Sequence, residues 1–255
     1  MVAIERHIGC ILFSTKEKIW LLVWREFLKR APLRRVMTRT VGLAQTSART
    51  ISGNAPRLLV IAGATGVGKS TASVRLAHES KFARLLSTDA IREIMRACDD
   101  DENNPSLHRS SFSRGDSGDP VIDWLETCNS VEPGIAATID RARREGIDLL
   151  IEGVHIVPSE RLLRAWRESG GIAVGVVMCV DTEVEHQQML KSRDAHSYRR
   201  ADRYIASFPR IRKIQGGLIE KAKIANWPIV DPTRVKDDVK KIQHLLDLAW
   251  NESRN

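Results

Sequence analysis

An α/β fold, in which a five-stranded parallel sheet lies between two layers of helices, is predicted by two features of the sequence. From about residue 57 onward, short apolar runs alternate with longer segments in which apolar residues recur at helical spacing. Strands that are separated by helices lie parallel in one sheet, and the helices cover both of its faces. In addition, a glycine-rich turn follows the first apolar run directly and opens a helix, as ligand-binding turns do in such sheets.

The sequence also indicates where each strand and helix begins and ends. Strands are expected at about 58–62, 83–87, 147–151, 172–180 and 227–230. Helices are expected at about 70–79, 90–98, 122–145, 159–169, 182–193 and 235–250, with a further long helix whose apolar spacing runs from 208 to 222. Gly146 is the expected C-cap of the third helix. Thr182 and Glu185 have the spacing of a capping box. The polar stretch 99–120 is expected to form irregular surface structure.

The charge is unevenly distributed and separates an N-terminal extension, residues 1–56, from a domain of residues 57–255. The whole chain carries a net charge of +8, and the first 56 residues contribute +7 of it through ten Lys/Arg and three Asp/Glu. Residues 17–29 have the spacing of an amphipathic helix. We favour a helix that packs on the core, or a poorly ordered tail, over contact with nucleic acid or an anionic membrane. Nucleic acid is therefore not an expected partner, and peripheral membrane contact by the extension stays open.

The composition excludes several protein classes. With 42% hydrophobic and 28% charged residues, it is typical of a soluble globular protein. No apolar run approaches the roughly 20 residues of a membrane-spanning helix, and no cleavable secretory signal is evident. The four cysteines are scattered and form no C-x-x-C pair, which argues against a zinc site and a disulfide framework. We therefore expect a reducing, cytoplasmic setting. The sequence carries no indication of the oligomeric state.

The glycine-rich turn has the complete pattern G-x-x-x-x-G-K-[ST] of a phosphate-binding loop, or P-loop. The residues expected to bind ATP are Gly63, Ala64, Thr65, Gly66, Val67, Gly68, Lys69, Ser70 and Thr71. Backbone N–H groups and the helix N-terminus are expected to surround the phosphates. Lys69 would reach the β- and γ-phosphates as a catalytic cation, and the Ser70 hydroxyl would bind Mg²⁺. On the helix that follows, Val74 and Ala77 are expected to face the sheet.

Charged residues follow the next two strands at the point where each strand ends, the edge at which such sheets bind ligands. Asp89 is expected to orient or deprotonate an acceptor hydroxyl, or alternatively to cap the helix 90–98. Arg92, one turn later, would grip an anionic acceptor or lie on the surface. Glu152 would hold Mg²⁺ through water. His155 would support the loop or contact the acceptor.

An arginine-rich segment follows the fourth strand. Its basic residues are Lys191, Arg193, Arg199, Arg200 and Arg203. In this position they are expected to form a lid that contacts phosphate, with Arg199 and Arg200 in catalytic roles, because catalysis of phosphoryl transfer is mostly positioning and cationic stabilisation. Two acids and a basic lid at successive strand ends thus predict a three-layer P-loop enzyme that phosphorylates a small anionic molecule.

Beyond the P-loop, four segments give the chain a more specific resemblance, which covers about residues 58–230. These segments are Ser87-Thr-Asp-Ala-Ile-Arg92, His108-Arg-Ser-Ser-Phe112, Ile151-Glu-Gly-Val-His-Ile-Val-Pro158 and Arg203-Tyr-Ile-Ala-Ser-Phe-Pro-Arg-Ile-Arg-Lys-Ile-Gln215. Together with the P-loop they resemble the 2-phosphoglycerate kinase family. The last two segments are the most specific, because the P-loop alone is shared by many activities.

The resemblance implies ATP-dependent phosphorylation of the 3-hydroxyl of 2-phosphoglycerate, giving 2,3-bisphosphoglycerate, on a nucleoside-kinase-like fold. A phosphorylated, carboxylated acceptor needs several cations. The residues expected to bind it are Asp89, Arg92, His108, Arg109, His155 and Arg203, with Arg199 and Arg200 nearby.

Two alternatives stay open at this point. One is a P-loop kinase of another hydroxyl, such as that of a sugar acid, a nucleotide sugar or an inositol phosphate, since related kinases change their acceptor through loop residues. The other is a non-catalytic ATP-binding regulator whose basic extension contacts nucleic acid or a membrane. A hydroxyl-activating acid such as Asp89 argues against the second alternative, because a pure binding module does not need one.

Overall fold

The computed structural model describes residues 55–99, 104–192, 201–235 and 237–253. The extension predicted for residues 1–56 lies outside these ranges except for its last two residues. The expectations for it, including the amphipathic helix and the membrane contact, stay predictions. None of the helices in the described ranges combines the length and apolarity that a membrane crossing requires.

Within the described residues, five parallel strands form a single sheet, which confirms the predicted fold class. The strands are β1 (Arg57–Gly63), β2 (Arg84–Ser87), β3 (Leu149–Gly153), β4 (Ile172–Met178) and β5 (Ile229–Val230). Their order across the sheet is β2-β3-β1-β4-β5, and each neighbouring pair runs parallel. All of β4, and β1 after its first residue, is apolar and buried, as expected of strands that are covered on both faces.

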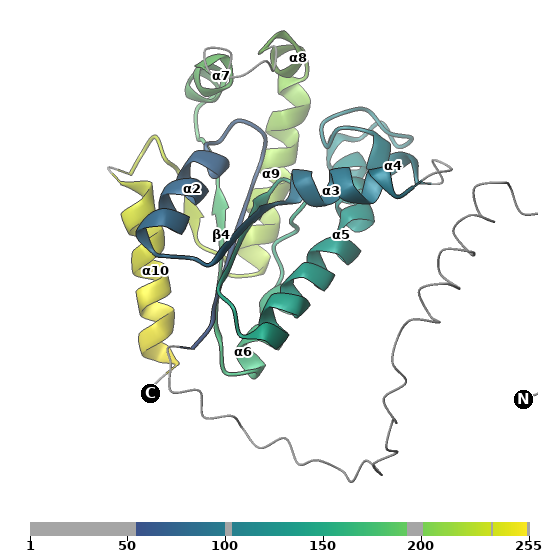
Figure 1. The fold of residues 1–255 in the computed structure, drawn as a ribbon. Coiled ribbons are helices and arrows are strands. Elements are labelled where there is room, and N and C mark those ends of the chain that lie inside the picture. The colour runs from purple at the N-terminus through teal and green to yellow at the C-terminus, as the bar shows by residue number, and fades with distance from the viewer. Residues whose placement is uncertain (1–54, 100–103, 193–200, 236, 254–255) are drawn as a thin grey trace, which may run out of the picture. The chain divides into compact units, whose positions relative to one another are not determined.

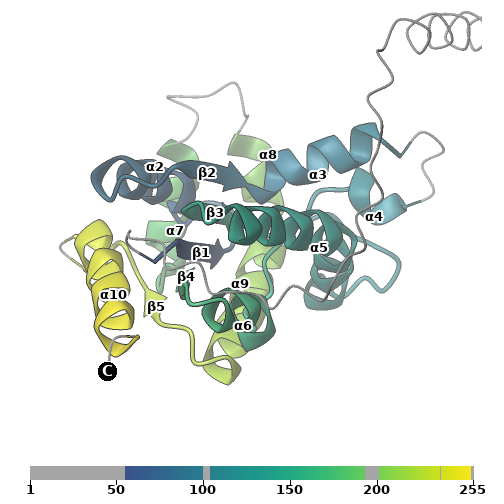
Figure 2. The ribbon, with the colours of Figure 1, turned by 60° about the horizontal axis from the view of Figure 1, so that its bottom comes forward.

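Helices cover both faces of this sheet. They are α2 (Lys69–Glu79), α3 (Thr88–Ala97), α4 (Pro105–His108), α5 (Pro120–Glu145), α6 (Glu160–Glu168), α7 (Glu183–Ser192), α8 (Ala201–Ala206), α9 (Phe208–Ile224) and α10 (Asp238–Glu252). Helices α2 and α10 lie on one side, and α5, α6 and α9 lie on the other (Figures 1 and 2). The indoles of Trp124 on α5 and Trp166 on α6 are fully buried and fill the interface between the sheet and the helices α5, α6 and α9.

The strand register brings distant parts of the sequence to one edge of the sheet. Glu152, near the end of β3, is in register with Ser87 of β2 on one side and with Ile61 of β1 on the other. Because all strands are parallel, the P-loop after β1 and the start of α3 after β2 both lie beside Glu152. The carboxyl ends of the strands are where open α/β sheets bind ligands, so this edge is the place to look for the site.

Two predicted helix caps are confirmed. Gly146 ends α5 with a φ of 65°, which is the left-handed conformation that a C-cap glycine adopts. At the start of α7, the Glu185 N–H donates to the Thr182 hydroxyl oxygen over 3.3 Å, and the Thr182 hydroxyl donates to the Glu185 carboxylate over 2.6 Å. Local sequence alone was sufficient for both.

Two expectations about α2 and α3 are wrong. Val74 is 60% exposed rather than packed on the sheet, because α2 buries the face that carries Ala72 and Leu76. Asp89 does not cap α3, since the cap is Ser87, whose hydroxyl oxygen accepts a hydrogen bond from the Ala90 N–H over 3.2 Å. Asp89 lies instead in the first turn of α3, where a carboxylate interacts favourably with the positive end of the helix.

Two segments also differ in their helical content. The stretch 99–120, expected to be irregular, contains the single turn α4. The long helix expected after the lid is divided into α8 and α9, with Ser207 between them. Pro209 at the start of α9 has no N–H to continue the hydrogen bonds of α8, which accounts for the break.

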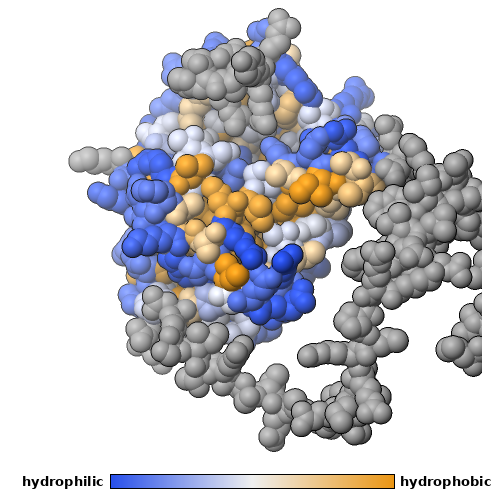
Figure 3. Space-filling view, viewed as in Figure 1, coloured by the Kyte–Doolittle hydropathy of each residue, from blue (hydrophilic) through white to orange (hydrophobic). Residues whose placement is uncertain are grey.

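Strand β2 is an edge of the sheet, and its side chains are only half-buried. An apolar band crosses the face that carries α2, β2 and α3 (Figure 3). The exposed or half-exposed apolar residues of these elements include Val74, Leu85, Leu86 and Ile94. The strand is only four residues long, which limits its capacity to pair with another strand.

Candidate active site

The P-loop joins β1 to α2, and three of its positions admit only glycine. Gly66 and Gly68 have φ angles of 93° and 85°, in the left-handed region that side chains disfavour. A Cβ on Gly63 would lie 2.5 Å from the Met178 carbonyl oxygen of the neighbouring strand. The glycines that the sequence motif specifies therefore serve both the turn and the close packing of β1 on β4.

The N-terminus of α2 is open toward an anion. Its N-cap is Gly68, which offers no side chain to the first N–H groups of the helix, and its first turn contains no acidic residue. The Lys69 side chain is largely buried, lines the adjacent cleft and donates from Nζ to the Ala64 carbonyl oxygen over 2.9 Å. Helix N–H groups that no side chain caps, beside a buried ammonium group, form a donor set that fits a chain of phosphates.

Ser70 and Glu152 meet beside the P-loop, although they are far apart in sequence. The Ser70 hydroxyl donates to Glu152 Oε1 over 3.0 Å, and Glu152 is 6% exposed. A hydroxyl and a carboxylate next to a phosphate site are oxygen ligands of the kind that Mg²⁺ prefers. The pair fits a Mg²⁺ ion, either directly or through water.

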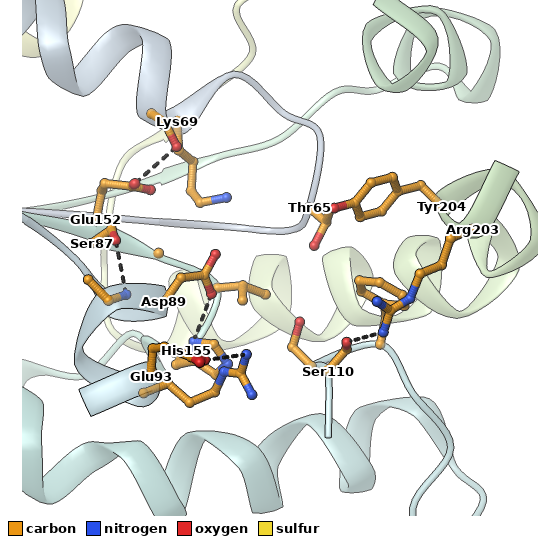
Figure 4. Close-up of a pocket in the computed structure, with 17 residues that line it drawn as sticks. Thr65, Lys69, Ser87, Asp89, Glu93, Ser110, Glu152, His155, Arg203 and Tyr204 are labelled. Atoms are coloured by element: carbon orange, nitrogen blue, oxygen red, sulfur yellow. Dashed lines mark hydrogen bonds and ion pairs between the residues drawn. The ribbon is translucent and has the colours of Figure 1, made fainter. Parts of the chain in front are cut away.

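A cleft of about 610 Å³ opens beside this pair at the carboxyl edge of the sheet (Figure 4). It is lined by Thr65, Lys69, Ser70, Ser87, Asp89, Ala90, Arg92, Glu93, Ser110, Ser111, Phe112, Glu152, Gly153, Val154, His155, Arg203 and Tyr204. Five segments that the sequence places far apart thus contribute: the P-loop, the start of α3, residues 110–112, the end of β3 with the residues after it, and helix α8. The segment 110–112 was part of the sequence resemblance, whereas Glu93 and Tyr204 had not been singled out as site residues.

Asp89 and His155 lie together on one wall of the cleft. Asp89 is 57% exposed, and its Oδ1 is 3.6 Å from Nδ1 of the buried His155. The same Nδ1 is 3.1 Å from the Thr88 hydroxyl oxygen. Burial lowers the pKa of His155 to about 4, with Asp89 opposing the shift and Arg92 and Lys69 adding to it. His155 is therefore neutral at pH 7, and Asp89 keeps an accessible carboxylate.

Arg92 lines the cleft and is held by the backbone of a neighbouring loop. Its Nη1 donates to the Leu107 carbonyl oxygen over 2.7 Å and to the Arg109 carbonyl oxygen over 3.3 Å. Its Nη2 is 3.9 Å from a carboxylate oxygen of Glu93. The guanidinium is thus fixed at the wall of the cleft by α4 and the residue that follows it.

Helix α8 contributes the opposite wall of the cleft. The Arg203 guanidinium donates to the Ser110 hydroxyl and lies 5.4 Å from the centre of the Phe112 ring. The Tyr204 ring packs on the same phenylalanine with a centroid separation of 5.5 Å. Side chains of α8 therefore contact the 110–112 segment on this side of the cleft (Figure 4).

His108 and Arg109 were expected to bind the acceptor, but neither lines the cleft. His108 Nε2 lies 3.1 Å from an Asp99 carboxylate oxygen. Arg109 donates to the Glu126 carboxylate and, over 3.0 Å, to the Asp123 carbonyl oxygen. Their observed partners are structural ones. Three of the expected lid residues, Arg193, Arg199 and Arg200, lie outside the described residues.

A partly buried ion pair that the sequence analysis missed supports the 110–119 loop. Arg210 donates to the Asp123 carboxylate over 2.7 Å and to the carbonyl oxygens of Phe112, Ser113 and Gly118. Burial alone would raise the pKa of Asp123, but hydrogen bonds from Ser117, the Gly115 N–H and Arg210 lower it to about 2. The one indication in the sequence was that Arg210 lies in segment 203–215, which resembles the kinase family.

Sequence comparison confirms the resemblance to 2-phosphoglycerate kinases. The chain is 35% identical to a protein of that name from Thermococcus kodakarensis, over 72% of this chain and 64% of the relative. The corresponding values are 33%, 73% and 59% for the Methanopyrus kandleri protein of the same name, and 30%, 78% and 65% for that of Methanocaldococcus jannaschii. The chain thus spans slightly less than two thirds of the length of these relatives.

Other comparisons add little. No family model matches the chain. A shikimate kinase from Bacteroides thetaiotaomicron, of solved structure, is similar at a TM-score of 0.43 and 14% identity, over 75% of this chain and 98% of that one. A similarity at that level carries no weight for function.

Proposed function

Because this chain is a sequence relative of the 2-phosphoglycerate kinases, we propose that it transfers the γ-phosphoryl group of ATP to the 3-hydroxyl of 2-phosphoglycerate. One observation carries the proposal. The P-loop, the Ser70–Glu152 pair and the exposed carboxylate of Asp89 line one cleft, and the cations Arg92 and Arg203 line it with them. A phosphate donor site and a hydroxyl-activating acid on one cleft are what a small-molecule kinase requires.

The nucleotide would bind through the P-loop and the N-terminus of α2. The backbone N–H groups and Lys69 place positive charge beside the phosphates, where negative charge spreads in the transition state. Ser70 and Glu152 would hold Mg²⁺, which supplies further neutralising charge at the phosphates when bound. The positive φ angles of Gly66 and Gly68 give the loop its turn before the nucleotide arrives.

Asp89 is the proposed base. It would accept the proton of the acceptor hydroxyl as the bond between that oxygen and the γ-phosphorus forms and the bond to the β,γ-bridging oxygen breaks. His155 stays neutral beside it and does not compensate its charge with an ion pair at pH 7. The Asp89 carboxylate is exposed on the wall of the cleft, where an acceptor hydroxyl can reach it.

The acceptor would bind between α3 and α8. 2-Phosphoglycerate carries a carboxylate and a phosphate, and the cleft offers Arg92 on one wall and Arg203 on the other. Arginine suits both anions, because its planar group donates two parallel hydrogen bonds. We keep Arg199 and Arg200 as further proposed contacts to phosphate. His108 and Arg109, which were expected to bind the acceptor, are proposed instead to support the segment that carries Ser110 to Phe112.

The experiment that tests this function is ADP release with ATP and Mg²⁺ against a panel of acceptors. The panel contains 2-phosphoglycerate, 3-phosphoglycerate, gluconate, UDP-N-acetylglucosamine and inositol phosphates. Turnover confined to 2-phosphoglycerate is the expected result. Turnover on another acceptor alone would keep the kinase and replace the substrate. Nucleotide binding without turnover on any acceptor would favour the regulator.

A further inference from the structure

His186 is a buried polar residue that the proposed reaction does not use. It lies on α7, is fully buried and is located 121 positions from the P-loop in sequence. Its Nε2 is nevertheless 2.8 Å from the carbonyl oxygen of Thr65, a residue within the P-loop. The edge of its ring packs against Phe208 of α9, with the ring centroids 5.4 Å apart and the planes at 71°.

This contact defines the state of the imidazole. A carbonyl oxygen only accepts, so Nε2 must carry the proton. Burial lowers the pKa of His186, although the Thr65 carbonyl opposes the shift, so the ring is neutral at pH 7. In the neutral ring Nδ1 then has no proton, and it is buried without a hydrogen-bond partner among the described residues. A buried nitrogen without a hydrogen-bond partner destabilises the folded protein. The hydrogen bond that Nε2 donates to the Thr65 carbonyl oxygen offsets this cost.

The direction of the Thr65 carbonyl matters because of what the loop must bind. A phosphate-binding loop works when successive N–H groups point inward, and each carbonyl must then point away from the anion. A carbonyl oxygen that turned inward would place a negative partial charge at the phosphates. Gly66, the next residue, already has a φ of 93° and offers little resistance to such a rotation of the peptide. Something outside the loop therefore has to hold this carbonyl.

Helix α7 packs closely on the loop and is suited to that task. A Cβ on Gly66 would overlap the Leu190 side chain and lie 3.2 Å from His186 Nε2, and one on Gly68 would lie 3.2 Å from Met189. Three contacts from one helix thus cover the P-loop from the outside. Only His186 among them carries a hydrogen-bond donor.

We infer that His186 is a positioning residue of the nucleotide site, which holds the Thr65 carbonyl turned away from the phosphates and so keeps the P-loop ready to bind ATP. The inference rests on the proposed nucleotide site and is independent of the identity of the acceptor. It makes α7 the element that links the P-loop to the residues that follow Ser192, where the arginine-rich lid was predicted.

The alternative is a histidine that only fills the core. The two roles differ in a measurable way. A core residue stabilises the free and the nucleotide-bound protein equally, so its loss lowers the melting temperature without changing nucleotide affinity. A positioning residue changes the affinity, because a loop that has relaxed must be reset when ATP binds.

The test is calorimetric titration of the full chain with ATP and Mg²⁺, which requires no turnover. His186→Phe keeps a ring but removes the donor, and His186→Gln keeps an amide donor. His244→Phe is the matched control, because His244 is an exposed residue on α10. We expect His186→Phe to weaken ATP binding about tenfold, and His186→Gln to stay within roughly threefold of the wild type. His244→Phe should bind as the wild type does, and the acceptor KM should not change in any variant.

Equal ATP affinity of His186→Phe and the wild type would overturn the inference, as would an equal loss in His186→Gln and His186→Phe. If the wild type itself does not bind ATP, the proposed function fails and this inference fails with it. Melting temperatures without nucleotide check that each variant is folded. Should the phenylalanine not be accommodated, His186→Met supplies a flexible side chain without a donor for the same titration.

Discussion

The Ser70 hydroxyl donates a hydrogen bond to Oε1 of Glu152 over 3.0 Å, across 82 positions of sequence. The bond ties the first turn of α2 to the end of β3, and both residues line the cleft. Neither strand β3 nor the P-loop holds such a pair by itself. The pair exists because β3 lies beside β1 in the sheet.

Replacing Glu152 with glutamine tests the proposed Mg²⁺ site. The amide retains an oxygen that can accept from Ser70, so the fold should be preserved while the charge is lost. We expect a loss of about 10- to 100-fold in activity or in apparent Mg²⁺ affinity, as is typical of groups that support a metal ion. The measurement is the rate of ADP release as a function of Mg²⁺ concentration. An unchanged Mg²⁺ dependence would contradict the assignment.

Replacing Gly153 with alanine tests the packing that supports the acid wall. The added Cβ would overlap the Thr88 hydroxyl oxygen, so Thr88 must move and its contact with His155 with it. We expect a loss of about 1–3 kcal/mol in the free energy of unfolding, as overpacking usually costs. Gly216→Ala on α9 is the control, since its new methyl group would meet no described atom within 4 Å outside its own helix, and alanine favours a helix by roughly 0.5–1 kcal/mol. Urea denaturation measures both, and an equal effect of the two changes would contradict the account.

Local sequence patterns predicted the fold, and they indicated several residues that the structure places in one cleft, because these residues are recognised by their local position in the chain. The P-loop is recognised in the sequence by its own glycines, and Asp89 and Glu152 are found by their positions near the ends of strands. Contacts across the sequence were not accessible in this way. Arg109 and Arg92 look equivalent as basic residues, yet Arg109 turns to Glu126 whereas Arg92 lines the cleft.

The pairing of Asp123 with Arg210 is another long-range contact of this kind, and it predicts a dependence of stability on pH. The pKa of Asp123 is lowered from 3.8 to about 2, so the folded state favours the ionised carboxylate. Its contribution is complete above about pH 4 and is lost as the pH falls toward 2. Asp123→Asn should therefore be less stable than the wild type at pH 6, with a difference that shrinks as the pH is lowered. Urea denaturation between pH 6 and pH 3 checks this, and a difference that grows toward low pH would contradict it.

Arg203 is predicted to act on the acceptor rather than on ATP. Arg203→Met removes the charge and the donor to Ser110 but keeps an apolar stem over Phe112. We expect the KM for 2-phosphoglycerate to rise by about tenfold or more, as for the loss of a charged hydrogen bond, while the KM for ATP stays within about twofold. Arg161→Met on α6 is the control, because Arg161 is exposed and pairs with Glu132, away from the cleft. The measurement is steady-state kinetics in which each substrate is varied in turn. An effect confined to the KM for ATP would contradict the assignment of Arg203 to the acceptor.

The most direct test of the account is product formation from 2-phosphoglycerate by the wild type and by Asp89→Asn, followed by ³¹P NMR with ATP and Mg²⁺. The wild type should convert 2-phosphoglycerate to 2,3-bisphosphoglycerate. Removal of the base should slow this by about 10²- to 10⁴-fold, the usual contribution of general-base catalysis, while ATP still binds. Absence of the bisphosphate with the wild type, or its formation at the wild-type rate by Asp89→Asn, would contradict the account.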